Sequence, residues 1–344
     1  MKRDIKSMTK AELSSAFSEL GLPAFRTKQV WQWLQEKGVM SFDSMTNISK
    51  DLREKLKSEF DIFGCEVEKK SVSQLDSTVK YLFRLIDGEF IESVLMKYKY
   101  GYSLCVSTQV GCRMNCAFCA TGVGGFVRNL TPAEILSQIH TAQNDMNIRV
   151  SHIVLMGMGE PMDNYDNVIR FLRLVNADDG LNIGMRNISL STCGIIPGIK
   201  KLQDEDLQLT LSVSLHAPND EIRSRLMPVN KKYGVDELLA ACREYGNATS
   251  RRISYEYAMF GGVNDSDECA KELANKLKGT LSHINLIPAN DVTESGLKSS
   301  TPERIKRFTE ILEKSGRNVT VRRSLGGDID ASCGQLRSKH KRLV

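Results

Sequence analysis

The spacing of apolar positions predicts that this chain of 344 residues begins with a small helical domain. Val30, Trp31 and Leu34 recur at positions i, i+1 and i+4, which places them on one face of a helix. The residues around them are rich in charge, as expected for a helical surface that faces solvent. We therefore assign residues 1–75 to a helical accessory domain.

A different pattern follows the helical part. Residues 81–86 and 90–94 read as two short strands of alternating character, and Asp87 and Gly88 separate them. Two such stretches around an Asp-Gly pair are typical of a β-hairpin. We assign residues 76–101 to a hairpin that links the helical domain to the rest of the chain.

Between residues 102 and 330, short apolar runs alternate with segments of helical periodicity, which predicts a parallel sheet with crossover helices. The expected strands are residues 104–107, 152–156, 187–191, 207–215, 253–257, 283–287 and 319–322. The expected helices are residues 132–144, 164–175, 235–245, 266–278 and 302–315. About six such units, fewer than the eight of a closed barrel, predict an α/β fold with a partial (β/α)6-type barrel. Chemistry in such folds lies at the carboxyl ends of the strands.

The composition, with 41% hydrophobic and 26% charged residues, is that of a globular protein and argues against a disordered or fibrous chain. No apolar run approaches the roughly 18 residues of a membrane span, and the first residues lack the apolar segment of a signal peptide. We expect a cytoplasmic protein with no membrane partner. The net charge of +5 is compatible with a nucleic-acid partner but is common among proteins that bind none.

Nine cysteines are an odd number for a chain without an export signal, so metal binding or thiol chemistry is favoured over a disulfide framework. Four of them fall within 15 residues: Cys105, Cys112, Cys116 and Cys119. Cys333 lies near the C-terminus. The other four are scattered and are best interpreted as small buried hydrophobic residues: Cys65, Cys193, Cys242 and Cys269.

Cys112, Cys116 and Cys119 form a CxxxCxxC motif directly after the first strand expected in the barrel. Three thiolates on one tight loop can bind three irons of a [4Fe-4S] cluster and leave the fourth iron without a protein ligand. That iron can chelate S-adenosylmethionine, and an electron from the cluster can then cleave a carbon–sulfur bond to give a 5′-deoxyadenosyl radical. A zinc site is the alternative, but structural zinc usually has four ligands in two pairs, and no second pair follows.

With these motifs the chain resembles the radical S-adenosylmethionine enzymes, and within them the RlmN/Cfr family of RNA adenine methyltransferases. The resemblance extends over nearly the whole chain. Its motifs, in the same order, are CVSTQVGC over 105–112, the cysteine loop, MGMGEP over 156–161, LST over 190–192, SVSLHA over 212–217, NLIPAN over 285–290 and DIDASCGQL over 328–336. The chain departs from the family at Ser332, where alanine is more frequent, and at Asp291, where proline is usual.

The resemblance also implies the residues that bind S-adenosylmethionine. Glycines at the end of a strand let the backbone pass close to a ligand, and a carboxylate there can receive the methionine amino group. Taken singly, polar residues at such strand ends more often satisfy loops, and a glycine-rich strand end is often only a turn. The implied set is Gly159, Glu160, Ser191, Ser214, Leu215, His216 and Asn290, beside the cluster ligands Cys112, Cys116 and Cys119.

Methylation of adenine at C2 or C8 requires a further cysteine, because these carbons are electron-poor and do not attack the electrophilic methyl group of S-adenosylmethionine. A cysteine that is first methylated can be converted by the deoxyadenosyl radical into a thiomethylene radical that adds to the ring. The resemblance assigns this carrier to Cys333 and the resolving thiol, which forms a transient disulfide with it, to Cys105. It assigns the base that accepts the ring proton to Glu92. Without it, Cys333 would be interpreted as a buried structural cysteine and Glu92 as an exposed strand carboxylate.

The resemblance implies that the enzyme uses two S-adenosylmethionine molecules to methylate C2 of adenine-2503 in the peptidyl-transferase region of 23S rRNA, and C2 of adenine-37 in tRNAs. C8 methylation of the same rRNA adenine, as in the resistance paralogues, is the alternative, and Gly159-Glu160-Pro161 favours C2. A non-catalytic, zinc-containing RNA-binding module is the remote alternative. We expect a monomer that takes electrons from an external donor of the flavodoxin or ferredoxin type.

Basic and aromatic residues are the expected contacts to RNA. Lys97–Tyr102 interleaves charge with stacking faces, and Arg251-Arg252 and Arg322-Arg323 add further charge. The segment 331–344 is assigned to a loop that carries the catalytic cysteine and to a basic tail, Arg337–Arg342. A basic tail is often only solvated, so its contact with RNA is a hypothesis.

Overall fold

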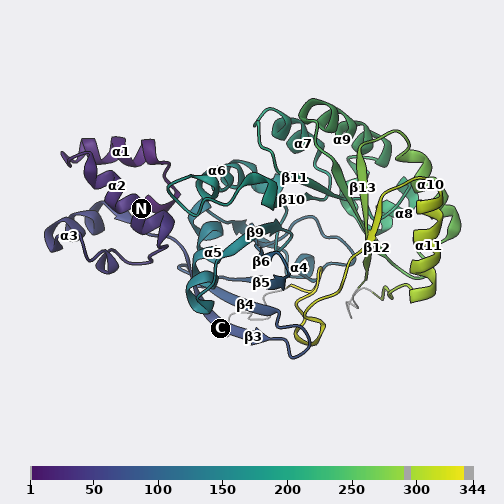
Figure 1. Cartoon of the computed structure of the whole chain (residues 1–344), viewed down its shortest axis with the longest axis horizontal. Helices are drawn as coiled ribbons and strands as arrows, with labels where there is room; N and C mark the ends of the chain where they lie inside the picture. Colours follow the sequence, from purple (N-terminus) through teal and green to yellow (C-terminus); the bar gives the residue numbers. More distant parts are fainter. Residues whose placement is uncertain (1, 290–295, 337–344) are drawn as a thin grey trace.

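The computed structural model describes residues 2–289 and 296–336. Three helices of the N-terminal part lie together at one end of the molecule, on the left in Figure 1. They are α1 (Lys10–Glu19), α2 (Phe25–Trp31) and α3 (Lys50–Glu59). The short strands β1 (Arg3–Asp4) and β2 (Phe60–Asp61) pair in parallel and join the two ends of this part.

The first helix begins where its sequence places a capping box. The Thr9 hydroxyl accepts a hydrogen bond from the Glu12 backbone nitrogen (3.2 Å), and the Glu12 carboxylate accepts one from the Thr9 backbone nitrogen (2.8 Å). Leu13 and Phe17, one turn apart, are buried on the inner face of the helix. Local sequence therefore sets both the start of this helix and the face that it buries.

One sheet of ten strands organises the rest of the chain, in the order β14-β13-β12-β11-β10-β9-β6-β5-β4-β3. From β6 to β14 neighbouring strands are parallel, and β3, β4 and β5 are antiparallel. The strands are β3 (Cys65–Val72), β4 (Val79–Leu85), β5 (Phe90–Tyr98), β6 (Gly101–Cys105), β9 (Val150–Leu155), β10 (Ile188–Thr192), β11 (Thr210–Ser214), β12 (Ile253–Met259), β13 (Ser282–Pro288) and β14 (Val319–Val321). Within the described residues β14 does not pair with β3, so the sheet is open, and the predicted α/β fold with a partial barrel is confirmed.

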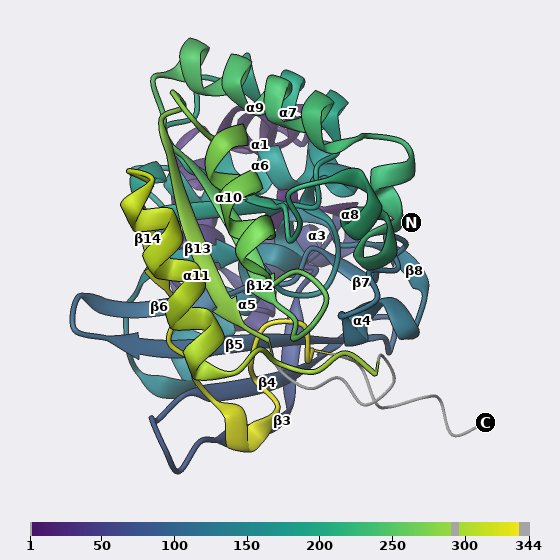
Figure 2. The same ribbon diagram turned by 90° about the vertical axis from the view of Figure 1, so that its right-hand side faces the viewer.

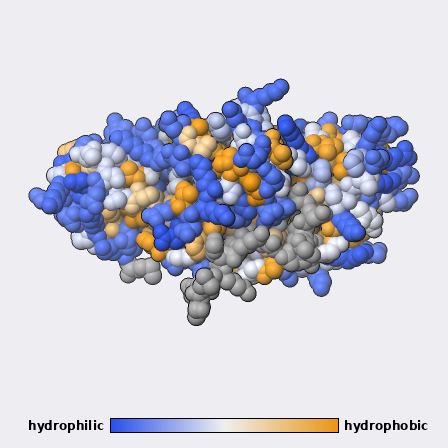
Figure 3. All heavy atoms as spheres, turned by 90° about the horizontal axis from the view of Figure 1, so that it is seen from below, coloured by the Kyte–Doolittle hydropathy of each residue, from blue (hydrophilic) through white to orange (hydrophobic). Residues whose placement is uncertain are grey.

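Helices cover the outer side of the parallel strands, as Figure 2 shows for α7, α9, α10 and α11. The helices are α5 (Pro132–Met146), α6 (Tyr165–Asn176), α7 (Ile196–Gln203), α8 (Asp220–Leu226), α9 (Val235–Thr249), α10 (Asp267–Lys276) and α11 (Pro302–Lys314). Within residues 2–289 and 296–336, no helix has the length and apolar character needed to cross a membrane. Hydrophilic side chains cover most of the face seen from below, and hydrophobic ones form small separate patches (Figure 3).

The structure differs from the prediction at the start of the sheet. β3 falls inside residues 1–75, which were expected to be helical, and the hairpin strands β4 and β5 continue the main sheet through β6. The side chains of β3 are mostly exposed on both faces, so the sequence lacks the alternation that marks a half-buried strand. A second hairpin, β7 (Gln109–Gly111) with β8 (Phe126–Asn129), and the short helix α4 (Ala120–Val123) were also not predicted.

Two buried bases lie where the N-terminal part packs against α5. The fully buried Lys6 donates a hydrogen bond from Nζ to Ser137 Oγ (2.9 Å), and His140 Nε2 lies 3.0 Å from the Gln35 carbonyl oxygen. Burial lowers the pKa of Lys6 to about 8 and that of His140 to about 3. Because burial disfavours the charged form of each base, this contact is sensitive to pH.

We expect the free energy of unfolding to fall when the pH is lowered from 7 to 5. Unfolded histidine binds a proton near pH 6.5 and buried His140 does not until about pH 3, so stability is lost as the pH falls through this window. The loss from His140 is about 2 kcal/mol between pH 7 and 5. In urea unfolding of cluster-free protein, His140→Gln should lose about 2 kcal/mol less than wild type over this range. An equal loss in both proteins would contradict the assignment.

Candidate active site

A cavity of about 170 Å³ lies at the carboxyl ends of the parallel strands. The three expected cluster ligands line it: Cys112, Cys116 and Cys119. Five of the residues expected to bind S-adenosylmethionine line it as well: Gly159, Glu160, Ser191, Ser214 and His216. Leu215 is fully buried and its side chain does not line the cavity, whereas Asn290 lies outside the described residues.

The cysteine loop is held at three points by backbone hydrogen bonds. Cys112 N donates to the Gly125 carbonyl (2.8 Å), Ala117 N to that of Leu226 (2.9 Å) and Ala120 N to that of Gly334 (2.7 Å). These bonds connect the loop to the β7–β8 hairpin, to the end of α8 and to the C-terminal segment. The aromatic ring of Phe118, inside the motif, meets the ring of His216 edge-on at 4.7 Å and tilts over Phe260 at 5.5 Å. Long-range contacts therefore fix a loop that has little regular structure of its own.

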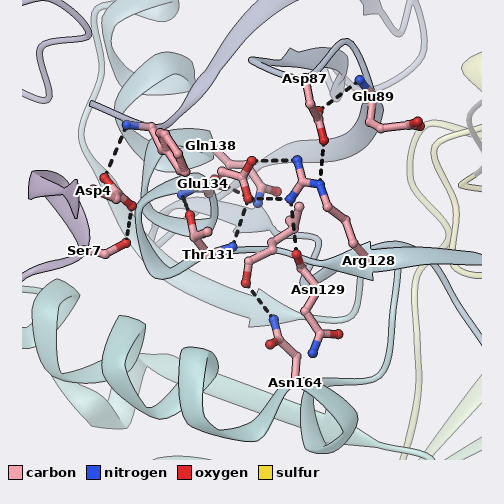
Figure 4. Close-up of polar contacts among 12 residues, drawn as sticks. Asp4, Ser7, Asp87, Glu89, Arg128, Asn129, Thr131, Glu134, Gln138 and Asn164 are labelled. Atoms are coloured by element: carbon pink, nitrogen blue, oxygen red, sulfur yellow. Dashed lines mark hydrogen bonds and ion pairs between the residues drawn. The ribbon is translucent and has the colours of Figure 1, made fainter. Parts of the chain in front are cut away.

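An arginine on β8 connects this hairpin to its neighbours (Figure 4). Arg128 Nη1 and Nη2 each lie 2.8 Å from the Glu134 carboxylate, and Nε donates to Asp87 at 2.6 Å. The same carboxylate accepts a hydrogen bond from Thr131 N (2.9 Å), which closes the capping box of α5. A bidentate arginine–carboxylate pair is geometrically specific, so it sets the position of β8 and, through it, of the loop.

Gly111 directly precedes the first cluster cysteine, and we predict that it tolerates no side chain. Its φ is +73°, and a Cβ would lie 1.9 Å from the carbonyl oxygen of Gly125. Gly21 has a φ of +69°, and a Cβ built there has no atom within 4 Å, so an alanine would meet the same backbone strain without the clash. We expect Gly111→Ala to lower the free energy of unfolding by about 3 kcal/mol or more, and Gly21→Ala by about 1 kcal/mol. Thermal unfolding of the two variants checks this, and equal losses would exclude the clash as the cause.

The arrangement of the cysteines suits a cluster better than a single ion. Within residues 2–289 and 296–336, no group of three or more His, Cys, Asp or Glu side chains is placed to hold one metal ion. The three thiols instead surround a cavity, and a four-iron cluster spreads its sulfur ligands further apart than one zinc ion at about 2.3 Å from each sulfur. The site therefore fits the cluster expected from the motif.

Glu160 is held rigidly at the wall of the cavity. Its side chain is buried, and its carboxylate accepts hydrogen bonds from the backbone nitrogens of Cys193 (2.7 Å) and Met162 (3.0 Å). Burial raises its pKa above the ordinary value despite these bonds. The neighbouring Gly159 has a φ of +100°, and a Cβ there would lie 2.5 Å from Gln109. This glycine thus permits close packing against β7, a need that the sequence pattern did not reveal.

His216 is kept neutral by its surroundings. It is buried with a φ of +56°, and its Nδ1 accepts a hydrogen bond from Ala258 N at 2.9 Å. Burial, and next the charge of Arg223, lowers its pKa to about 3. With Nδ1 acting as an acceptor, the proton resides on Nε2. His216 can therefore donate one hydrogen bond to a ligand without carrying charge.

Arg223 is a further buried residue that sequence reasoning missed. Its guanidinium donates to the carbonyl oxygens of Cys193 (2.6 Å), Ser214 (3.1 Å) and Leu215 (3.1 Å). These carbonyls follow or end β10 and β11, so one side chain joins the two strand ends that carry Ser191 and Ser214. Arg223 lies on α8, where no helix was predicted, and only the tertiary structure shows that its side chain is fully buried.

A second cavity of about 40 Å³ adjoins the first and holds both expected redox cysteines. Cys105, at the end of β6, and Cys333 line it, and Cys333 also lines the cofactor cavity. Arg322, directly after β14, lines both cavities too. Burial raises the pKa of Cys105 to about 12, and the charge that Cys333 can carry is the main cause that raises the pKa of Arg322. No disulfide links any of the nine cysteines, all of which are described.

Glu92 lies beside these cavities rather than within them. It shares a face of β5 with Val94 and Met96, which line the second cavity, but it lines a separate space of about 180 Å³. Its side chain is buried, which corrects the interpretation as an exposed strand carboxylate. The reason is the segment after β14, which runs back against β4 and β5 and covers this face (Figure 2).

Two comparisons bear on the family. Residues 106–274 match the radical SAM superfamily, and residues 3–62 match the ribosomal RNA large subunit methyltransferase N-terminal domain. A protein of Clostridium novyi described as a probable dual-specificity RNA methyltransferase RlmN is 53% identical over 340 residues, which cover 99% of each chain. This chain belongs to the RlmN family. A relative from Lachnospira eligens with the same description is 52% identical, over 98% of this chain and 96% of its own.

A solved structure supports the RlmN assignment in three dimensions. A radical SAM methyltransferase from Sphaerobacter thermophilus superimposes with a TM-score of 0.94 at 42% identity, covering 97% of this chain and 99% of its own. The resemblance expected from the motifs, the enzyme class and the cofactors, a [4Fe-4S] cluster and S-adenosylmethionine, are thereby confirmed. In this RlmN member, Cys112, Cys116 and Cys119 line the cavity and are the residues that could hold the cluster.

Proposed function

We propose that this RlmN-family enzyme methylates C2 of adenine in RNA, at adenine-2503 of 23S rRNA and adenine-37 of tRNAs, with Cys333 as the methyl carrier. One observation supports the carrier role above the others: Cys333 lines both the cofactor cavity and the cavity that holds Cys105. A carrier has to meet the methyl donor on one side and the resolving thiol on the other. Of the described cysteines, Cys333 is the one that lines both cavities.

When bound, the cluster and S-adenosylmethionine supply a methyl group in one round and a 5′-deoxyadenosyl radical in the next. Cys333 accepts the methyl group as a thiolate, whose lone pair forms the new sulfur–carbon bond while the methyl group leaves the sulfonium sulfur. Arg322 lines both cavities together with Cys333, so a positive charge faces the site of methyl transfer. His216 and Glu160 hold S-adenosylmethionine, His216 by a neutral imidazole N–H and Glu160 by a fixed carboxylate.

In the second round the deoxyadenosyl radical would take one hydrogen atom from the methyl group on Cys333 and leave as 5′-deoxyadenosine. The remaining carbon radical would add to the adenine ring, and the adduct would return its unpaired electron to the cluster. The steps that follow release the RNA. Glu92 takes the proton from the adducted ring carbon. Cys105 forms a disulfide with Cys333 while the sulfur–methylene bond breaks, and the electron pair of that bond goes to the carbon, which takes up a proton to become the methyl group. An external thiol reductant then reduces the disulfide. Cys105 is suited to this step because it lines the same small cavity as Cys333.

A stacked pair of tyrosines beside the second cavity supports RNA as the substrate. Tyr98 lines that cavity, and its ring stacks on that of Tyr100 at 5.0 Å and 8°. Tyr100 is 61% exposed, so it offers a face to an unstacked base. Arg323, exposed on the same rim, can meet phosphate. The basic tail expected to bind RNA, Arg337–Arg342, lies outside the described residues.

The product decides between the candidate functions. Anaerobically purified, cluster-reconstituted enzyme is incubated with S-adenosylmethionine, a reductant and either an unmodified 23S rRNA fragment or unmodified tRNA, and the digested nucleosides are analysed by mass spectrometry. We expect 2-methyladenosine from both RNAs. Finding 8-methyladenosine instead would establish the C8 alternative. Finding no methylated nucleoside, together with bound zinc and no iron, would support the non-catalytic module.

A further inference from the structure

We propose that Lys80 is a positioning residue for the base: it holds the Glu92 carboxylate and fastens it to the backbone of the segment that carries Cys333. This inference rests on the proposed function, which gives Glu92 the role of proton acceptor. It adds a residue that no motif singled out. The two contacts that define it come from one ammonium group that bridges β5 and the C-terminal segment.

The ion pair between Lys80 and Glu92 is short and largely removed from water. Lys80 Nζ lies 3.0 Å from Glu92 Oε1, and their side chains are only 13% and 8% exposed. Lys80 lies on β4 opposite Val94, and Glu92 on β5 opposite Leu82, so the two are diagonal neighbours on one face of the sheet. Leaving either charge buried without the other is strongly unfavourable, so the pair holds the carboxylate in one place.

The same ammonium group also holds the C-terminal segment. Lys80 Nζ donates a hydrogen bond to the Asp330 carbonyl oxygen at 3.0 Å, three residues before Cys333. Ile329 and Asp330 close the space of about 180 Å³ in which Glu92 lies, and Ala331 to Cys333 close the cavity of the two redox cysteines. Lys80 therefore fixes the position of Glu92 relative to the segment that carries Cys333.

Other attachments of this segment do not involve the base. The Asp328 carboxylate accepts hydrogen bonds from Ser73 Oγ (2.7 Å) and Gln74 N (2.9 Å), and Asp76 accepts one from Gly326 N (2.9 Å). These contacts fasten the segment to the turn between β3 and β4. Since they persist without Lys80, its removal should disturb Glu92 more than the segment as a whole.

In the proton-transfer step, the C–H bond of the adducted ring carbon breaks and an O–H bond forms on Glu92. The electron pair of the C–H bond stays on the adenine ring. The carboxylate has to be aimed at that hydrogen, and a fixed ammonium partner provides this orientation. Methylation of Cys333 by S-adenosylmethionine needs no such proton transfer. The two half-reactions should therefore respond differently to the loss of Lys80.

The test compares full-length, cluster-loaded Lys80→Met and Lys80→Arg with wild type in single turnovers on RNA carrying deuterium or hydrogen at adenine C2. We expect Lys80→Met to methylate Cys333 at the wild-type rate, measured by peptide mass spectrometry, but to resolve the RNA adduct about 10²-fold more slowly. Proton transfer then limits release, so a primary deuterium isotope effect should emerge in Lys80→Met. Lys80→Arg should recover most of the rate. Lys70→Met is the matched control, because Lys70 pairs with Asp145 away from the site.

Three results overturn the inference. Adduct resolution in Lys80→Met at the wild-type rate would show that Glu92 needs no such partner. Slow methylation of Cys333 in the same variant would show that Lys80 supports the segment as a whole rather than the base. If Lys80→Met resolves the RNA adduct slowly but shows no isotope effect, the defect lies in a step other than proton transfer to Glu92. The proposed function fails separately, if wild type itself forms neither methylated Cys333 nor methylated adenine.

Discussion

Cys333→Ala is expected to abolish RNA methylation, by about 10⁴-fold or more, without loss of the cluster. Alanine offers no sulfur to receive the methyl group, and adenine carbons do not attack the sulfonium methyl directly, so no other route stays open. Cys333 does not belong to the CxxxCxxC motif that is placed to bind the irons. The variant should therefore keep the iron content and visible absorption of the wild-type enzyme.

The measurement combines nucleoside mass spectrometry with a search for S-methylcysteine in the digested protein. Wild type incubated with S-adenosylmethionine should contain a methyl group on the Cys333 peptide, and the variant should contain none. Cys269→Ala is the control, because Cys269 is buried in α10 and lines neither catalytic cavity. Methylated RNA from Cys333→Ala at more than trace level would exclude the carrier role.

Local signals in the sequence predicted most of the fold and the cofactor site. Strand–helix alternation gives the parallel sheet, because each crossover helix has its own periodicity and caps, as the Thr131–Glu134 box does at α5. The spacing of the three cysteines predicts a cluster site without any long-range contact, because all three lie on one loop. Polar residues at the ends of β10 and β11 were expected at the same place because parallel strands bring their carboxyl ends to one edge.

The rest depends on contacts between residues far apart in the chain. Glu92 is buried because the segment after β14 covers β5, and this segment is fastened by a bond from Ser73 to Asp328, 255 residues away. Glu256, a carboxylate in the apolar run of β12, also lines the cofactor cavity. Arg322, which was expected to contact RNA, lines that cavity as well. A charged residue within an apolar strand was the one available signal for Glu256.

The Lys80–Glu92 pair is a second example of a contact that sequence patterns do not predict. Each residue alone is typical of an exposed strand position, and hairpin register alone predicts only that they are diagonal neighbours. What turns the pair into part of the site is the carbonyl of Asp330 above it. Sequence patterns describe the two faces of a strand but not which distant segment covers one of them.

Cys105→Ala should trap the reaction at the covalent adduct between Cys333 and adenine. Methyl transfer to Cys333 and the addition to the ring do not need Cys105, whereas breaking the sulfur–methylene bond requires a second sulfur. In the second cavity the described cysteines Cys105 and Cys333 are the two that line the wall, so no other thiol is placed to substitute. Release of methylated RNA should fall about 10³-fold or more, while one RNA per enzyme becomes attached.

The adduct is measured as a protein band of higher mass that survives denaturation and thiol reductants, because it is a thioether and not a disulfide. After nuclease digestion the Cys333 peptide should carry a single modified adenosine. Cys105→Ala combined with Cys333→Ala should form no adduct, and Cys112→Ala, which removes a proposed cluster ligand, should form none either. Turnover of Cys105→Ala at the wild-type rate would show that product release does not use the Cys105–Cys333 disulfide, and the small cavity that unites these two sulfurs would then need another explanation.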